Sequence, residues 1–291
     1  MAKTANDAFD QFNKNLIPSK SERDKASSHR QTIYDKLNTE FGLHRMFQSG
    51  SFKHGTGISG HSDVDYFASL KSDRPSSSDT ILDSVRTKLQ ARFPSTNVHV
   101  SRPAVVLEFG QGYERVEIIS AYTQGSINEA KDVKFKIPSV VPGDWLESTP
   151  EAHLTYVNGS DLKAPNGSTK NLTRLIKAWK YYCNVPISSF YLEMRAASYM
   201  RTQESYVPWW DIYLLLKRLD DNQLAAMNDP TGNTGRIYAC STTHKAEEAL
   251  SKLSTALIRA EKAKDYLKGG YTEEAFAEWD KLFGGKFPAF Y

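Results

Sequence analysis

Two aspartates separated by a single valine, Asp63 and Asp65, have the type and spacing for metal chemistry. They lie at the start of a run that alternates as a β-strand does, residues 64–70. Side chains at positions i and i+2 of a strand project to one face, so the two carboxylates should lie together. Adjacent carboxylates repel unless a cation neutralises them, and such hard oxygen ligands suit Mg²⁺ and substrate phosphates. The pair predicts a magnesium site, with a solvated acidic turn as the alternative.

A third carboxylate is needed if two metal ions are to be held, one of them activating an attacking hydroxyl. Glu117 fits this role because it interrupts an apolar, strand-like run over residues 116–119. Glu108 lies in a similar strand context and competes with Glu117 for the role. A glutamate inside a strand usually faces solvent instead, so both assignments stay open at this point.

A glycine-rich stretch, GSFKHGTGISGHSDVDY over residues 50–66, leads into the acidic pair. Gly50 allows the backbone to approach an anion closely, and Ser51 can donate a hydroxyl and an N–H to phosphate oxygens. The stretch has no GxxxxGK[ST] pattern, so it is not a Walker loop. It indicates either a phosphate-binding segment beside metal ligands or a flexible surface loop.

These residues must be positioned by helices and strands, and the order of helix-like and strand-like segments in the sequence predicts an α+β fold. The first half should form a mixed sheet with helices: helices within 7–40 and over 80–93, and strands over 46–47, 64–70, 98–100, 104–109 and 115–120, with a hairpin turn at 110–112. Residues 122–167 have an irregular pattern. The second half should be helical, with helices over 169–183, 189–204, 207–227, 243–266 and 272–283.

The composition is that of an ordinary globular protein, with 40% hydrophobic and 24% charged residues among 291. The net charge of +3 falls short of the strongly basic balance of a duplex-binding domain. The two cysteines, Cys183 and Cys240, form neither a disulfide framework nor a zinc pattern. No run approaches the roughly 18 apolar residues of a membrane span. These features predict a soluble, cytoplasmic protein without zinc.

Residues 50–66 resemble the cGAS/DncV-like nucleotidyltransferases (CD-NTases) of bacterial CBASS anti-phage systems, a branch of the polymerase-β-like superfamily. A Gly-Ser pair, a spacer, Asp-x-Asp on a strand and a later carboxylate on a partner strand form the superfamily pattern. Many CD-NTases read QGS-x4-T-x-I-x2-xSDVD, and the matching residues here are Thr56, Ile58, Ser62, Asp63, Val64 and Asp65. The resemblance is most specific over residues 46–70 and weaker over 10–205. Two departures are Glu117, where many members have Asp, and Ser49 between Gln48 and Gly50.

A capped amphipathic helix predicted over residues 168–180 places Lys177 and Lys180 off its apolar stripe. Most lysines of this kind are simply solvated. In the resembling family, however, an RLIKxWK-like helix lends a lysine to the triphosphate, and a serine follows before the next helix. The resemblance therefore implies phosphate binding by Lys177, with Lys180 as the alternative, and by Ser189.

The resemblance implies a bilobal nucleotidyltransferase, with a catalytic core over residues 1–165 and a helical lobe over 166–291 that closes the cleft. A ribose hydroxyl would attack the α-phosphorus of an NTP (ATP, GTP or a pyrimidine NTP) and release pyrophosphate. Two Mg²⁺ ions, or Mn²⁺ as a substitute, would bind Asp63, Asp65 and Glu117. Gly50, Ser51, Lys177 and Ser189 would hold the triphosphate.

The implied product is a cyclic oligonucleotide, in the simplest case a cyclic dinucleotide, sensed by a downstream effector protein. One alternative is a template-free RNA-tailing enzyme or a synthase of linear oligonucleotides. Another is a catalytically inactive, antitoxin-like module that only binds nucleotides. Activation by duplex nucleic acid is not expected, because the sequence has no His/Cys cluster for a zinc insertion.

Overall fold

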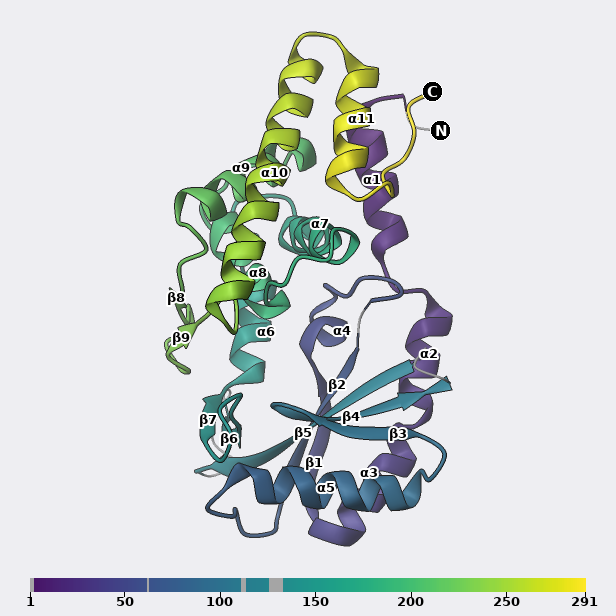
Figure 1. Cartoon of the computed structure of the whole chain (residues 1–291), viewed down its shortest axis with the longest axis vertical. Coiled ribbons are helices and arrows are strands. Elements are labelled where there is room, and N and C mark those ends of the chain that lie inside the picture. Colours follow the sequence, from purple (N-terminus) through teal and green to yellow (C-terminus); the bar gives the residue numbers. More distant parts are fainter. Residues whose placement is uncertain (1–2, 62, 111–113, 126–132) are drawn as a thin grey trace.

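The computed structural model describes residues 3–61, 63–110, 114–125 and 133–291. Ser62, and residues 111 and 112 of the predicted hairpin turn, lie outside these ranges. A sheet with its covering helices forms one half of the molecule, and a group of helices forms the other (Figure 1). The α+β class predicted from the sequence is confirmed.

The sheet is mixed and is ordered β1-β2-β5-β4-β3, with β6 paired to β5 and β7 paired to β6. Strands β2 and β5 are parallel, and the other pairs are antiparallel. The strands are β1 (Leu43–Ser49), β2 (Val64–Leu70), β3 (Asn97–Ser101), β4 (Ala104–Phe109), β5 (Glu114–Gln124), β6 (Lys134–Pro138) and β7 (Trp145–Ser148).

Side chains alternate between the two faces of the sheet along β2 and β5. Val64 and Tyr66 of β2, and Val116 and Ile118 of β5, belong to one buried cluster. That cluster also contains the apolar residues of α3 (Arg30–Phe41) and α5 (Ser78–Arg92), which therefore cover this face. Because side chains alternate, the residues between them, at positions 65 and 117, face the opposite side.

The helical half consists of α6 (Pro150–Asn158), α7 (Ser168–Tyr182), α8 (Ser189–Met200), α9 (Pro208–Asp221), α10 (Thr243–Lys268) and α11 (Thr272–Leu282). Between α9 and α10 lies a small hairpin of β8 (Met227–Asn228) and β9 (Arg236–Ile237). The predicted helices of this half are present, although the second and third end at 200 and 221 instead of 204 and 227. No helix among the described residues is both long enough and apolar enough to cross a membrane.

The N-terminal segment connects the two halves. Helix α1 (Ala5–Leu16) packs in the helical core, where Phe9 and Phe12 meet aromatic rings of the C-terminal residues. Helix α2 (Lys20–Ser28) then begins with a capping box, in which Glu22 accepts from the backbone N–H of Ser19 at 2.7 Å and the Ser19 hydroxyl accepts from the backbone N–H of Glu22 at 3.1 Å. By packing, α1 therefore belongs with the helical half, although sequence reasoning grouped it with the sheet.

Two regions differ from the sequence prediction. Within 122–167, the described residues include the end of β5, the strands β6 and β7, and α6. The glycine-rich stretch opens with a single helical turn, α4 (Gly50–His54). Elements this short carry too few periods to stand out from a loop in sequence.

Candidate active site

The carboxylates predicted to bind metal lie on the two adjacent parallel strands. Asp65 of β2 is the register partner of Glu117 of β5. Asp63, two residues before Asp65, lies on the same side. The structure therefore brings Asp63, Asp65 and Glu117 together on the face away from α3 and α5.

Glu108, the competing third carboxylate, lies one strand further from Asp65. It is the register partner of Arg115 across β4 and β5, not of Glu117. Its carboxylate accepts a hydrogen bond from Asn97 Nδ2 at 2.7 Å. The geometry favours Glu117 over Glu108, because Glu117 alone of the two neighbours Asp65 directly.

The three carboxylates of this cluster carry like charges and repel one another. Burial raises the pKa of Asp63 to about 6, with Arg115 opposing the shift and Glu117 adding to it. Burial also raises the pKa of Asp65 well above its ordinary value, and Glu117 and Asp63 reinforce this. Burial and mutual repulsion disfavour the ionised form of these carboxylates. A bound cation would stabilise that ionised form, so the cluster is suited to bind one. Their oxygens suit Mg²⁺ and Mn²⁺, which prefer hard ligands.

Arg115, which sequence reasoning missed, is a cation that the structure places in direct contact with two of these groups. Its Nη2 lies 2.8 Å from Glu117 Oε1, and its Nε lies 3.5 Å from Asp63 Oδ2. No group of three His, Cys, Asp or Glu side chains within the described ranges already has an arrangement that could hold a metal ion. The only signal in the sequence was a basic residue two positions before Glu117, which places it on the same strand face.

Gly50 is required by its contact with the acidic pair. Its φ is +62°, a conformation that favours glycine, and an added Cβ would overlap the carboxylate of Asp65. Ser49, just before it, is the register partner of Asp65. The predicted close approach at Gly50 is thus an approach to Asp65 itself, and Ser51 follows in the first turn of α4.

The rest of the glycine-rich loop is held by helices of both halves. Arg174 of α7 donates to the Gly55 carbonyl at 2.7 Å. From α2, the Glu22 carboxylate accepts from the Ser59 hydroxyl at 3.0 Å and from the Gly60 N–H at 2.8 Å. These bonds exclude the flexible-loop interpretation for residues 55–60.

Lys177 lies in a buried polar network behind this loop. Its Nζ is 2.7 Å from Glu193 Oε2 and donates to the Thr56 hydroxyl at 3.1 Å. The other oxygen of Glu193 is 2.5 Å from His54 Nδ1. Although burial works in the opposite direction, Lys177 and His54 hold the pKa of Glu193 well below its usual range. The Lys177 side chain is 2% exposed and its ammonium is already paired with Glu193. Phosphate binding by Lys177 stays a prediction.

Lys180, the alternative lysine, contacts the predicted serine. Its Nζ donates to Ser189 Oγ, which also lies 3.1 Å from the Tyr181 hydroxyl. Burial and the neighbouring Lys177 lower the pKa of Lys180 to about 8, while the charge of Asp63 opposes this shift. Burial raises the pKa of Tyr181, and the nearby negative charges of Asp63, Asp65 and Glu117 raise it further. Lys180, near the end of α7, therefore faces the acidic cluster, and Ser189 at the start of α8 lies beside it.

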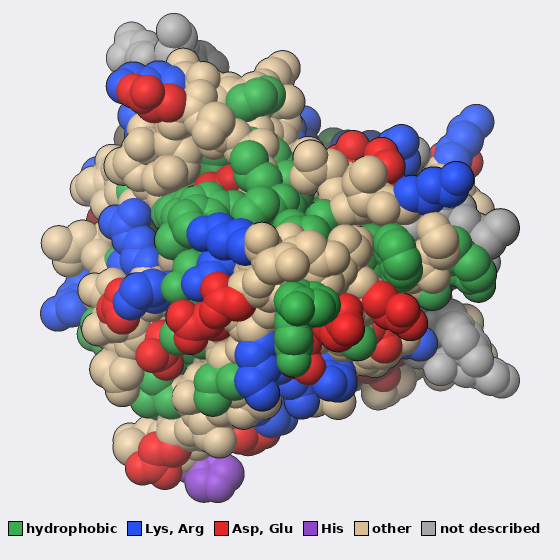
Figure 2. All heavy atoms as spheres, turned by 90° about the horizontal axis from the view of Figure 1, so that it is seen from above, with side chains coloured by type: hydrophobic (Ala, Val, Ile, Leu, Met, Phe, Trp, Pro, Cys, Tyr) green, Lys and Arg blue, Asp and Glu red, His purple; other side chains and the backbone are tan. Residues whose placement is uncertain are grey.

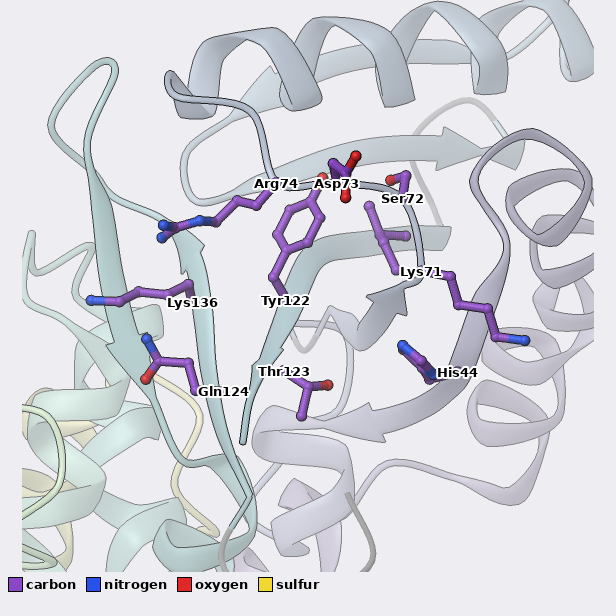
Figure 3. A pocket seen from close by; sticks show the side chains of 10 residues that line it. His44, Lys71, Ser72, Asp73, Arg74, Tyr122, Thr123, Gln124 and Lys136 are labelled. Carbon is purple, nitrogen blue, oxygen red and sulfur yellow. The ribbon is translucent and has the colours of Figure 1, made fainter. Parts of the chain in front are cut away.

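A surface hollow at the opposite end of the two central strands is separate from this site (Figure 3). It is lined by residues after β2 and at the end of β5, including Lys71, Arg74 and Tyr122, and by Lys136 of β6. Arg74 and Lys136 extend to one side of the hollow, whereas Lys71 extends to the other (Figure 3). These cations do not converge on one point.

A mixed sheet with carboxylates on adjacent parallel strands, facing a helical half that carries a lysine and a serine, defines the class of bilobal nucleotidyltransferases. The chain belongs to the family of Second Messenger Oligonucleotide or Dinucleotide Synthetase (SMODS) domains, whose model matches residues 3–160. The predicted membership among cGAS/DncV-like nucleotidyltransferases is thereby confirmed. No curated protein sequence matches the chain significantly.

Solved structures resemble this one over nearly its whole length. The structure of Escherichia coli MS115-1 CdnC with ATP has a TM-score of 0.78 at 18% identity, covering 98% of this chain and 99% of CdnC. Bradyrhizobium diazoefficiens CdnG in complex with GTP has a TM-score of 0.72 at 12% identity, with 97% and 99% covered. Vibrio cholerae DncV cyclic AMP-GMP synthase, with a linear intermediate bound, has a TM-score of 0.65 at 13% identity, with 97% and 86% covered. At these identities the likeness is one of fold.

Proposed function

We propose that this protein is a Mg²⁺-dependent nucleotidyltransferase that makes a cyclic oligonucleotide, in the simplest case a cyclic dinucleotide, from NTPs. The observation that carries the proposal is the register pairing of Asp65 with Glu117, with Asp63 on the same face. This arrangement supplies the three carboxylates that two-metal phosphoryl chemistry requires.

In this proposal Asp63, Asp65 and Glu117 hold the metal ions. When bound, the ions lower the pKa of the attacking ribose hydroxyl and neutralise charge on the triphosphate. Lys180 and Ser189 bind the triphosphate from the helical side, where they already contact each other. Ser51 binds it from the sheet side, next to Gly50. Lys177 is left to hold the glycine-rich loop through Thr56.

The relatives support the substrates and the setting that we propose. CdnC was solved with ATP, CdnG with GTP, and DncV is a cyclic AMP-GMP synthase, so purine NTPs are the first substrates to test. We extend to this chain a cytoplasmic role in anti-phage signalling, in which the product acts on an effector protein. Figure 2 shows acidic and basic side chains interspersed on the helical end of the molecule.

The test is to incubate the protein with all four NTPs and Mg²⁺ or Mn²⁺ and to measure pyrophosphate and phosphatase-resistant product. Asp65→Asn should lower turnover by about a hundredfold or more, because a metal ligand is lost without a change of shape. Glu108→Gln is the matched control and should retain activity. Mass spectrometry of the product separates cyclic from linear oligonucleotides. Nucleotide binding without pyrophosphate release would support the inactive module instead.

A further inference from the structure

The guanidinium of Arg115 lies between two of the carboxylates assigned to metal. It stands two residues before Glu117 on β5, and the Asp63 carboxylate approaches it from the start of β2. Glu108, its register partner on β4, adds a third negative charge nearby. Arg115 is therefore the counter-ion of the acidic cluster.

This guanidinium is held loosely. Among the residues that the structure describes, it makes one hydrogen bond, to Glu117 at 2.8 Å, and its buried Nε has no hydrogen-bond partner, 3.5 Å from Asp63. Arg45, by contrast, binds Glu151 through two hydrogen bonds, at 3.0 and 3.1 Å. A single charge-assisted hydrogen bond fixes an arginine less firmly than a bidentate pair does. The Arg115 side chain is also 36% exposed, so it has room to move toward solvent.

A divalent ion would need the same oxygens. One oxygen of Glu117 and one of Asp63 are within ion-pair distance of Arg115. A metal bound to those oxygens would bring a second positive charge to within a few ångströms of the first, which is unfavourable at short range.

We infer that Arg115 stands in for the metal between Asp63 and Glu117 in the metal-free protein, and that metal binding requires its guanidinium to move away. Arg115 thereby weakens metal affinity while it prevents the carboxylates from repelling one another. The inference rests on the proposed function, in which these carboxylates bind the metal.

The experiment is a Mn²⁺ titration of the full chain without nucleotide, at constant pH and ionic strength, with free Mn²⁺ followed by electron paramagnetic resonance. Arg115→Met should bind Mn²⁺ at least about fivefold more tightly than the wild type, because the competing charge is gone. Arg115→Lys keeps the charge and should remain near the wild type. Arg45→Met is the matched control, since it removes an equally exposed arginine from another ion pair, and it should leave the affinity unchanged.

Equal or weaker Mn²⁺ binding by Arg115→Met, with its fold verified by circular dichroism, would overturn the inference. Tightening by Arg45→Met to the same extent would overturn it too, because the effect would then be one of net charge. Asp65→Asn separates the two proposals: if it leaves wild-type Mn²⁺ binding unchanged, the metal site itself is wrong. If it abolishes binding while Arg115→Met changes nothing, only the role of Arg115 is lost.

Discussion

Lys177 and Lys180 are one helical turn apart on α7, yet their surroundings differ. Lys177 is neutralised by Glu193 inside the protein, at 2.7 Å. Lys180 has a hydroxyl as its neighbour, and burial together with Lys177 lowers its pKa to about 8. Within the described ranges no carboxylate is paired with Lys180 as Glu193 is with Lys177. Such a cation has more to gain from a phosphate, which is why we assign the triphosphate to Lys180.

This assignment predicts a pH dependence. Because the pKa of Lys180 is lowered, it loses its proton at a lower pH than an ordinary lysine, and kcat/KM for ATP should fall as pH rises through about 8. Lys180→Arg should remove this decline, because a guanidinium stays charged. The decline would be measured from profiles of kcat/KM against pH, over an assay range of about three pH units, between about 6.5 and 9.5. Lys53→Arg, on the exposed side of α4, is the control, and an unchanged decline in Lys180→Arg would contradict the assignment.

At the scale of elements, the one-turn helix α4 and the loop after it are fastened to α7 and α8. Glu193 of α8 joins Lys177 of α7 to His54 of α4. All three side chains are buried, with exposed fractions of 2% for Lys177, 4% for Glu193 and 6% for His54. This network fixes the position of α4, which carries Ser51 directly after Gly50, relative to Ser189 on the helical side.

Lys177→Met should therefore destabilise the protein by about 3–5 kcal/mol, because it leaves Glu193 buried with His54 alone. Urea unfolding measures this loss, and hydrogen exchange should show faster opening of residues 50–60. The double variant Lys177→Met, Glu193→Leu should recover much of the stability. If Lys177→Met raises only the KM for ATP and leaves stability unchanged, then Lys177 is a phosphate ligand after all.

At the scale of the whole molecule, the first helix completes the core formed by the last residues of the chain (Figure 1). The Phe9 ring lies edge-on to Trp279 and to Phe287, with centroid distances of 5.0 and 4.8 Å. The chain then crosses to the sheet half, where Glu22 holds Ser59. The N-terminal segment thus links the helical half to the glycine-rich loop.

Phe9→Ala should lower the free energy of unfolding by about 3–5 kcal/mol, the usual effect of removing a fully buried phenyl ring. Urea denaturation followed by tryptophan fluorescence would detect it, since Trp279 loses its neighbour. Phe290→Ala is the control, because that ring is 37% exposed, and it should change stability by less than about 1 kcal/mol. A loss below that value for Phe9→Ala would show that α1 is dispensable to the helical core.

The sequence by itself determined the elements whose signal is local. The period of 3.6 predicted the helices of the second half, and the period of two predicted β2 with its acidic pair on one face. The strands β6 and β7 were missed although Val133, Phe135 and Ile137 alternate, because so short a run in a polar region carries little weight. Family resemblance supplied the nucleotidyltransferase class.

Only the tertiary structure decided which residues meet. The choice of Glu117 over Glu108 depends on the register between β2 and β5, which no single strand contains. The contact between Arg115 and Asp63 depends on the same pairing. His54 and Glu193 touch across 139 positions of sequence. The periods of helices and strands can be recognised from residues that are neighbours in the sequence. Contacts of this kind form when packing brings distant segments together, so local sequence patterns do not predict them.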